Sequence, residues 1–329
     1  MRFILPFLLS FLAAPAFAQC VGENLIAAMS DDERNRLNAT VQQQPFPEGN
    51  LWHAQKGDST IHIMGTMHLN DSRLTSYLQP LWPIIDSADL ILLEGDRATM
   101  EQLKTEMMTN PSIMFITDGA TLPERLTETE WQELSQQMSA RGLPAFMVSK
   151  MRPWYVSMLL ALPPCAMAGM KNPNGVDHRI INRATKHNIP TAALEPFDTI
   201  FSLFGGGDKD EELDMIRMAL AGAQSGDAMI ATMMESYLRG AHLEIWEFSR
   251  KYSVEKMDLP KEKSMEIFAE MEAKMLTDRN ENWMGVILPA AAKNGNIVVA
   301  VGAAHLSGKQ GVLNLLAQSG YELSRIQGF

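Results

Sequence analysis

Two strand-like runs, one near each end of the chain, lead into the same short motif. The first run, residues 61–64, continues as Gly-Thr-Met-His68-Leu, and the second, residues 297–301, continues as Gly-Ala-Ala-His305-Leu. Short apolar runs that stop at a glycine are typical of buried strands, and the glycine permits a tight turn before the histidine. We therefore expect both histidines in loops directly after strands, and we expect the intervening chain to bring His68 and His305 together.

The rest of the chain alternates short strand-like runs with long stretches of helical periodicity. Residues 51–55 and 60–64 flank a Lys-Gly-Asp turn and predict a hairpin. Further strands are expected at residues 88–93, 191–194, 296–301 and 321–326, and helices at 23–44, 71–86, 178–187, 228–250, 264–293 and 310–319. This pattern predicts an α/β fold, with a mixed α+β sheet built from the N- and C-terminal parts of the chain and a large helical insertion or cap.

We expect a single domain over residues 19–329. Its sheet core would come from about residues 51–96, 171–200 and 294–329, and its helical insertions from about residues 97–170 and 205–292. A chain of this length buries enough apolar surface for one large core.

The first 18 residues have the pattern of a cleavable signal peptide. Arg2 supplies the positive charge, residues 3–12 form an apolar core, and Ala16-Phe-Ala18 is a small-x-small cleavage site, so we expect cutting after Ala18. No later segment approaches the ~20 apolar residues that a membrane-spanning helix needs. The sequence therefore predicts a periplasmic or secreted protein without an integral membrane segment.

The net charge and the cysteine content restrict which partners and which cellular compartment are expected. The formal net charge of −11 disfavours nucleic acid or an anionic membrane surface as a partner. The two cysteines, Cys20 and Cys165, reach an oxidising compartment after export, where they either form a disulfide or remain two unpaired thiols.

Polar side chains follow four of the predicted strands. His68, Glu94 with Asp96, Glu195 and His305 each come at or just after a strand's carboxyl end. Ligands of open α/β sheets bind at that edge. Two imidazoles with two or three carboxylates suit a divalent ion such as Zn²⁺, Mn²⁺ or Co²⁺, which would activate a water molecule. Glu94 is our choice for the general base.

Each of these residues also has a structural explanation. A histidine after a strand is often a hydrogen-bonded structural residue, and Glu195 could pair with an arginine. Asp177 is a candidate N-cap for the helix expected at residues 178–187. Arg279 and Asn280, late in a long predicted helix, either bind substrate and an oxyanion or lie on the helix surface. The remaining histidines are interpreted as ordinary polar residues: His53, His62, His178, His187 and His242.

Several well-known catalytic motifs are missing from the sequence. There is no Gly-x-Ser-x-Gly, no phosphate-binding loop with Gly-Lys-Ser/Thr, no His-Glu-x-x-His and no dinucleotide fingerprint. Serine hydrolases, nucleotide triphosphatases, conventional zinc proteases and dehydrogenases are therefore disfavoured.

The motifs taken together resemble the TraB/GumN family, which includes the Tiki-type proteases. The resemblance runs from Leu51 to the C-terminus and rests on these segments: Leu51-Trp52, Gly65-Thr-Met-His68, Leu93-Glu94-Gly-Asp96, Gly175-Val-Asp177, Ala193-Leu-Glu195, Arg279-Asn280-x-x-Trp283 and Val301-Gly-Ala-Ala-His305-Leu. It implies an α/β fold related to erythromycin-esterase-like and haem-binding ChaN-like proteins. It also implies metal-dependent peptide hydrolysis, with His68, Glu94 and His305 at the centre of the active site and Arg279 and Asn280 supporting them.

Two hypotheses about function follow. The first is an exported metal-dependent hydrolase, a peptidase acting on a peptide or small-molecule substrate. The second is a non-catalytic periplasmic protein that sequesters a peptide or haem in the same cleft, helped by an adaptable groove containing Met107, Met108, Met233 and Met234.

Overall fold

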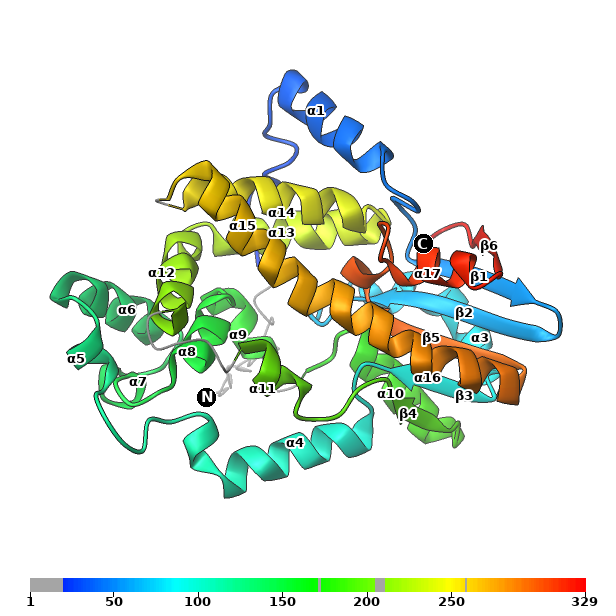
Figure 1. Ribbon diagram of the computed structural model, residues 1–329, viewed down its shortest axis with the longest axis horizontal. Coiled ribbons are helices and arrows are strands. Elements are labelled where there is room, and N and C mark those ends of the chain that lie inside the picture. The colour runs from blue at the N-terminus through cyan, green and yellow to red at the C-terminus, as the bar shows by residue number, and fades with distance from the viewer. Residues whose placement is uncertain (1–19, 171–172, 205–210, 258) are drawn as a thin grey trace, which may run out of the picture.

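The computed structural model describes residues 20–170, 173–204, 211–257 and 259–329 (Figure 1). The expected signal peptide and its cleavage site after Ala18 lie outside the described residues. Across the described parts, no helix combines the length and the apolar character needed to cross a bilayer.

A mixed six-stranded sheet forms the centre of the fold and confirms the predicted α/β class. The strand order is β4-β3-β5-β2-β1-β6, with β5 parallel to both β2 and β3, β3 parallel to β4, and β1 antiparallel to β2 and β6. The strands are β1 (Leu51–Lys56), β2 (Ser59–Thr66), β3 (Leu90–Leu93), β4 (Thr191–Ala193), β5 (Asn296–Gly302) and β6 (Glu322–Arg325). The predicted hairpin is β1–β2, and the two ends of the chain pair within one sheet as expected.

Strand register places the two Gly-x-x-His motifs next to each other. In the parallel pair β2–β5, Gly65 lies opposite Val301 and Thr66 lies opposite Gly302. On the other side of β5, Leu93 at the end of β3 lies opposite Ala300. Because β2, β3, β4 and β5 run in the same direction, their carboxyl ends meet at one edge of the sheet.

Apolar layers cover both faces of this sheet. On β5, Val298 and Ala300 contribute to one core cluster, while Ile297, Val299 and Val301 contribute to the other. A parallel strand buried on both faces needs such a continuous apolar run. The strand that carries the second motif is therefore rigidly embedded, and its last residue is held in a fixed place.

The helical insertion has its own hydrophobic core beside the sheet (Figure 1). The helices of the chain are α1 (Asp31–Gln42), α2 (Leu74–Tyr77), α3 (Trp82–Asp86), α4 (Arg97–Thr109), α5 (Leu122–Arg125), α6 (Glu128–Ala140), α7 (Ala145–Val148), α8 (Pro153–Leu160), α9 (Pro164–Met170), α10 (Val176–His187), α11 (Thr199–Phe204), α12 (Glu211–Ala223), α13 (Gly226–Leu238), α14 (His242–Lys256), α15 (Lys261–Glu272), α16 (Asp278–Asn294) and α17 (Val312–Gln318). Helices α5–α8 and α12 form a lobe to one side, whereas α10 and α16 lie along the sheet.

Some predicted helices are shorter or broken in the structure. The helix expected at residues 23–44 begins only at Asp31, because Ser30 forms a capping box with Glu33. The helix expected at residues 228–250 is interrupted after Leu238, because Gly240 adopts a φ of +72°. The helix expected at residues 71–86 is a series of short turns interrupted by prolines.

Candidate active site

Three of the predicted strand-end residues converge on Gly302 at the end of β5. A Cβ atom placed on this glycine would lie 3.2 Å from Oε1 of Glu94, 3.5 Å from Cδ2 of His305 and 3.9 Å from Nε2 of His68. The Gly302 backbone N–H also donates to Oε1 of Glu94 at 2.6 Å. The space that a side chain would fill is therefore left open between the three residues proposed as the centre of the site.

A carboxylate on a neighbouring helix orients His68. Nδ1 of His68 lies 2.7 Å from Oδ2 of Asp177, and the Thr66 hydroxyl donates to Oδ1 of the same carboxylate at 2.5 Å. The charge of Asp177 raises the pKa of His68 to about 9. Without an ion His68 is therefore protonated at neutral pH, and binding a metal through Nε2 would release that proton.

Asp177 does not have the N-cap role that its position suggested. Helix α10 begins two residues earlier than expected, at Val176, with Gly175 as its N-cap, and Asp177 lies in the first turn. Gly175 is required there because its backbone packs against the chain at His68, where a Cβ would lie 2.2 Å from the His68 carbonyl oxygen. This close approach ties α10 to the loop after β2 and turns Asp177 toward His68.

His305 is buried, and its tautomer is set by Asn280. The amide nitrogen of Asn280 donates to the carbonyl oxygen of Gln310 at 2.9 Å, which directs Oδ1 toward Nδ1 of His305 at 2.6 Å. Nδ1 therefore carries the proton, and Nε2 is left with its lone pair as an acceptor. Burial lowers the pKa of His305 to about 4, so the ring is neutral at pH 7. The ring also packs on Trp283, with centroids 4.5 Å apart.

Arg279 links the carboxylates of the site. Its guanidinium donates to Oε2 of Glu94 at 2.6 Å and to both oxygens of Glu195, at 2.6 and 2.9 Å, and it lies over the ring of Trp283. Nη1 is 3.2 Å from Nε2 of His305. Glu195 thus pairs with an arginine, the structural alternative considered for it, and holds Arg279 beside Glu94.

The environment keeps Glu94 ionised. Burial acts to raise its pKa, but His305, His68, Arg279 and the Gly302 N–H together lower it below the usual range. The π-helical turn Ala273–Thr277 comes directly before α16, and Arg279 donates to the Met275 carbonyl within it. Such turns are frequent at functional sites, and this one sets the position of Arg279.

Two other sequence-based candidates have different outcomes. Asp96 is the N-cap of α4, where its carboxylate accepts from the Thr99 backbone and hydroxyl. Cys20 and Cys165 form a disulfide, so the alternative of two unpaired thiols does not hold in the structure.

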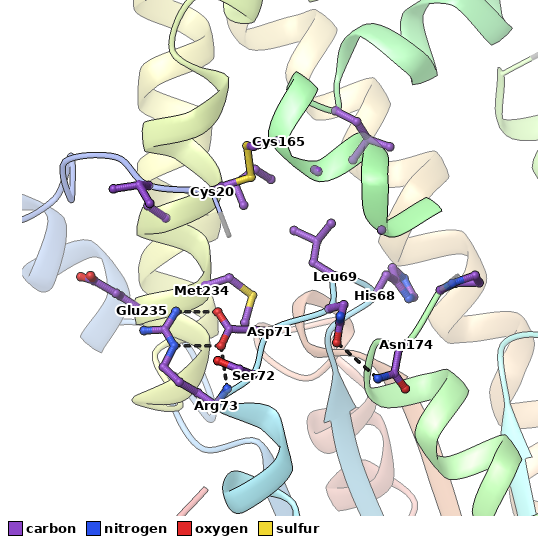
Figure 2. Close-up of a pocket in the computed structure, with 18 of the residues that line it drawn as sticks. Cys20, His68, Leu69, Asp71, Ser72, Arg73, Cys165, Asn174, Met234 and Glu235 are labelled. Atoms are coloured by element: carbon purple, nitrogen blue, oxygen red, sulfur yellow. Dashed lines mark hydrogen bonds and ion pairs between the residues drawn. A yellow bond between two sulfur atoms is a disulfide. The ribbon is translucent and has the colours of Figure 1, made fainter. Parts of the chain in front are cut away.

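A cavity of about 770 Å³ borders His68 (Figure 2). Its walls come from the N-terminal segment at residues 20–22, the loop after β2, α9, the start of α10 and α13. His178, which we interpreted as an ordinary polar residue, also lines this cavity, and both of its ring nitrogens are buried without a hydrogen-bond partner among the residues that the structure describes. The one sequence signal that could have indicated it is its position directly after Asp177.

The donor chemistry of the site suits a divalent ion. Each histidine is oriented through Nδ1 by a side-chain oxygen, which is the usual arrangement of metal-binding histidines. Within the described residues, no three His, Cys, Asp or Glu side chains are already grouped closely enough to hold an ion. Arg279 occupies Nε2 of His305 and Oε2 of Glu94, so an ion would replace its contact with that nitrogen.

Two known proteins are similar in sequence to most of this chain. The chain is 21% identical over 264 residues to the protein YbaP of Escherichia coli (strain K12), covering 79% of this chain and 89% of that protein. The YbaP protein of Shigella flexneri matches with the same identity and coverage. Residues 50–325 match the model of the TraB/PrgY/gumN family, and this protein therefore belongs to that family.

Proposed function

We propose that this protein is an exported metal-dependent hydrolase that cleaves peptide bonds. The observation that carries the proposal is the convergence of two imidazoles and one carboxylate on the open space at Gly302. Membership of the TraB/PrgY/gumN family supports it, since the sequence resembles the Tiki-type proteases of that family. Export is supported by the N-terminal sequence pattern and by the disulfide, which is typical of oxidising compartments.

His68 and His305 would hold a Zn²⁺, Mn²⁺ or Co²⁺ ion through their Nε2 atoms, with Oε1 of Glu94 beside them. When bound, such an ion supplies a Lewis acid for the water nucleophile and the substrate carbonyl. Glu94 either completes the ligand set or takes the proton from the attacking water. Asp177 and Asn280 keep the two imidazoles in orientation.

Arg279 has a separate role in this proposal. Its guanidinium lies between Glu94 and His305 and carries a permanent positive charge. A cation fixed at this place stabilises negative charge that develops on a substrate oxygen. Glu195 and Trp283 hold it there, so the charge is already in place before substrate binds.

The test combines metal analysis with a cleavage assay. We expect the purified mature protein to bind one of the three ions by calorimetry and elemental analysis, and to cleave members of a peptide library until a chelator is added. His68→Ala and His305→Ala should lose both properties. His53→Ala, on strand β1 next to the edge strand β6, should keep them. A wild-type protein that binds none of the three ions would refute metal dependence.

A non-catalytic binding protein is the second candidate, favoured by the size of the cavity beside His68. The methionine groove expected for it does not form, because Met234 lines the cavity but Met108 is 71% exposed and Met233 packs among α1 and α14. Retention of intact peptide regardless of chelator, or a Soret band on titration with haem, would support this function against the hydrolase.

A further inference from the structure

The cavity beside His68 has a polar end that the proposed catalytic residues do not use. His178 follows Asp177 in the first turn of α10 and lines the cavity together with Asn174 and Arg179. Both imidazole nitrogens of His178 are buried, and neither has a hydrogen-bond partner in the described part of the chain. Arg179, in contrast, is engaged, since it donates to the Asn174 carbonyl and to the Thr75 hydroxyl.

A buried imidazole without hydrogen-bond partners lowers the stability of the fold unless a ligand binds it. A neutral ring offers one N–H donor and one acceptor, and burying either without a partner is unfavourable. A peptide group carries the complementary pair, one C=O and one N–H. Either open position of His178 can therefore bind one side of a peptide group that enters the cavity: the ring N–H donates to a peptide carbonyl, or the bare nitrogen accepts from a peptide N–H.

The rest of the cavity wall is suited to an apolar side chain. Leu69, Leu162, Ile230 and Met234 line it, and Val21, 86% exposed, lies on the N-terminal segment at the same cavity. Figure 2 shows the side chain of Leu69 extending from the loop after β2 toward α9, with the Cys20–Cys165 disulfide beyond it. The disulfide fixes the N-terminal segment to α9 and so keeps this part of the wall in place.

The acidic groups of the wall are already engaged. Asp71 accepts from the Arg73 guanidinium through both of its oxygens, and Glu235 accepts from the Asn24 amide. An acidic ligand side chain placed among the apolar residues Leu69, Ile230 and Met234 would lose its hydration, and this disfavours it at that part of the wall.

We propose that this cavity is the substrate-binding subsite next to the cleaved bond, taking an apolar side chain against Leu69, Ile230 and Met234 while His178 binds the adjoining peptide group. The assignment rests on the proposed hydrolase function. The volume of the cavity lies within the range of ordinary ligand pockets, which are largely apolar and contain a few well-placed polar groups. His178 acts in binding, and the subsite selects apolar over acidic residues.

The test is a binding titration that needs no cleavage. Mature protein with ¹³C-methyl-labelled methionine, in chelator, is titrated with N-acetyl-leucine methylamide or N-acetyl-aspartate methylamide, and Met234→Leu identifies the Met234 signal. We expect the leucine probe to shift this signal saturably and the aspartate probe to leave it unchanged at equal concentration. An unmoved Met234 signal, or equal shifts with both probes, overturns the proposal.

Variants separate hydrogen bonding from a structural role. His178→Ala should weaken the leucine probe by about three- to tenfold, the value of one or two hydrogen bonds, and His178→Gln should restore much of it because it keeps a donor and an acceptor. His187→Ala, at the far end of α10, is the matched control. Ala231→Phe should block the cavity and abolish the shift with His178 intact. Wild-type affinity in both His178→Ala and Ala231→Phe would exclude the subsite.

The two proposals fail in different ways. A saturable, leucine-selective shift in a protein that cleaves no peptide refutes the hydrolase but leaves the cavity as a peptide-binding site. Chelator-sensitive cleavage with no selectivity for leucine over aspartate at the Met234 signal refutes the subsite but leaves the hydrolase.

Discussion

Nδ1 of His305 lies 2.6 Å from Oδ1 of Asn280, and this contact fixes which ring nitrogen of His305 is available to a ligand. The amide of Asn280 cannot turn over without losing its bond to the Gln310 carbonyl. The turn Ala303–His305, which carries the second Gly-x-x-His motif, is thus linked to α16. One helix therefore both sets the tautomer of His305 and places the guanidinium of Arg279 beside it.

Replacing Asn280 tests this link. Asn280→Leu removes the acceptor and should lower metal affinity by about 10- to 100-fold, the usual effect of losing such a partner. Asn280→Asp keeps an acceptor for Nδ1 and should retain most of the affinity. Calorimetric titration measures both variants, and equal affinities in the two would show that the tautomer of His305 does not matter.

Arg279 should be important for stability as well as for activity. Removing it in Arg279→Met leaves Glu94 and Glu195 partly buried without their shared cation, and we expect a loss of about 3–5 kcal/mol. The double variant Arg279→Met/Glu195→Gln removes one of the two uncompensated charges and should recover part of that loss. Urea unfolding measures the series, and strictly additive losses would contradict the coupling.

Gly302 is the sharpest test of the open space at the site. Gly302→Ala has an allowed backbone conformation, but its methyl group would lie 3.2 Å from Glu94 and 3.5 Å from His305. We expect a folded protein with at least about tenfold weaker ion binding, since the methyl group enters the proposed ion position. Gly285→Ala, in the middle of α16 with open space around it, is the control and should gain about 0.5–1 kcal/mol. Unchanged ion binding in Gly302→Ala would place any ion elsewhere.

His242 makes folding sensitive to acid. It is buried between Asn50 and Ser307, and burial lowers its pKa to about 3, below the value of 6.5 in the unfolded chain. Between pH 6.5 and 3 the unfolded state therefore takes up a proton that the folded state does not, so stability falls as pH falls, by up to about 1.4 kcal/mol per pH unit. His242→Asn should be less stable at pH 7 but should lose less on going to pH 5. Parallel losses for the two proteins in urea unfolding would contradict this role.

The disulfide should contribute strongly to stability. Cys20 and Cys165 are separated by 145 positions, and closing a loop of that length restricts the unfolded chain. Cys20→Ser/Cys165→Ser should lose about 2–5 kcal/mol in urea unfolding. The wild type under a dithiol reductant should approach the same value, and a wild type that is equally stable oxidised and reduced would contradict the prediction.

The strands and the polar residues at their ends were predictable from the sequence. Alternating and continuous apolar runs are local signals, and they were enough to place His68, Glu94 and His305 after strands and to predict a sheet built from both ends of the chain. The same local signals failed at helix boundaries, as at Gly240, because a break there depends on backbone conformation and on contacts with distant residues.

The contacts of each polar residue, in contrast, depend on how distant segments pack together. Glu94 and Asp96 stand two positions apart, yet one faces Gly302 and the other caps α4. The sequence position of Asp177 suggested a helix N-cap. Because Gly175 packs against the chain at His68, the Asp177 carboxylate instead binds that histidine. His178 had no sequence signal beyond its position directly after Asp177, because the cavity that it lines is made by five segments far apart in the chain. Hydrogen-bond partners and cavities are set by long-range packing, whereas the periodicity of a sequence reports only the local structure.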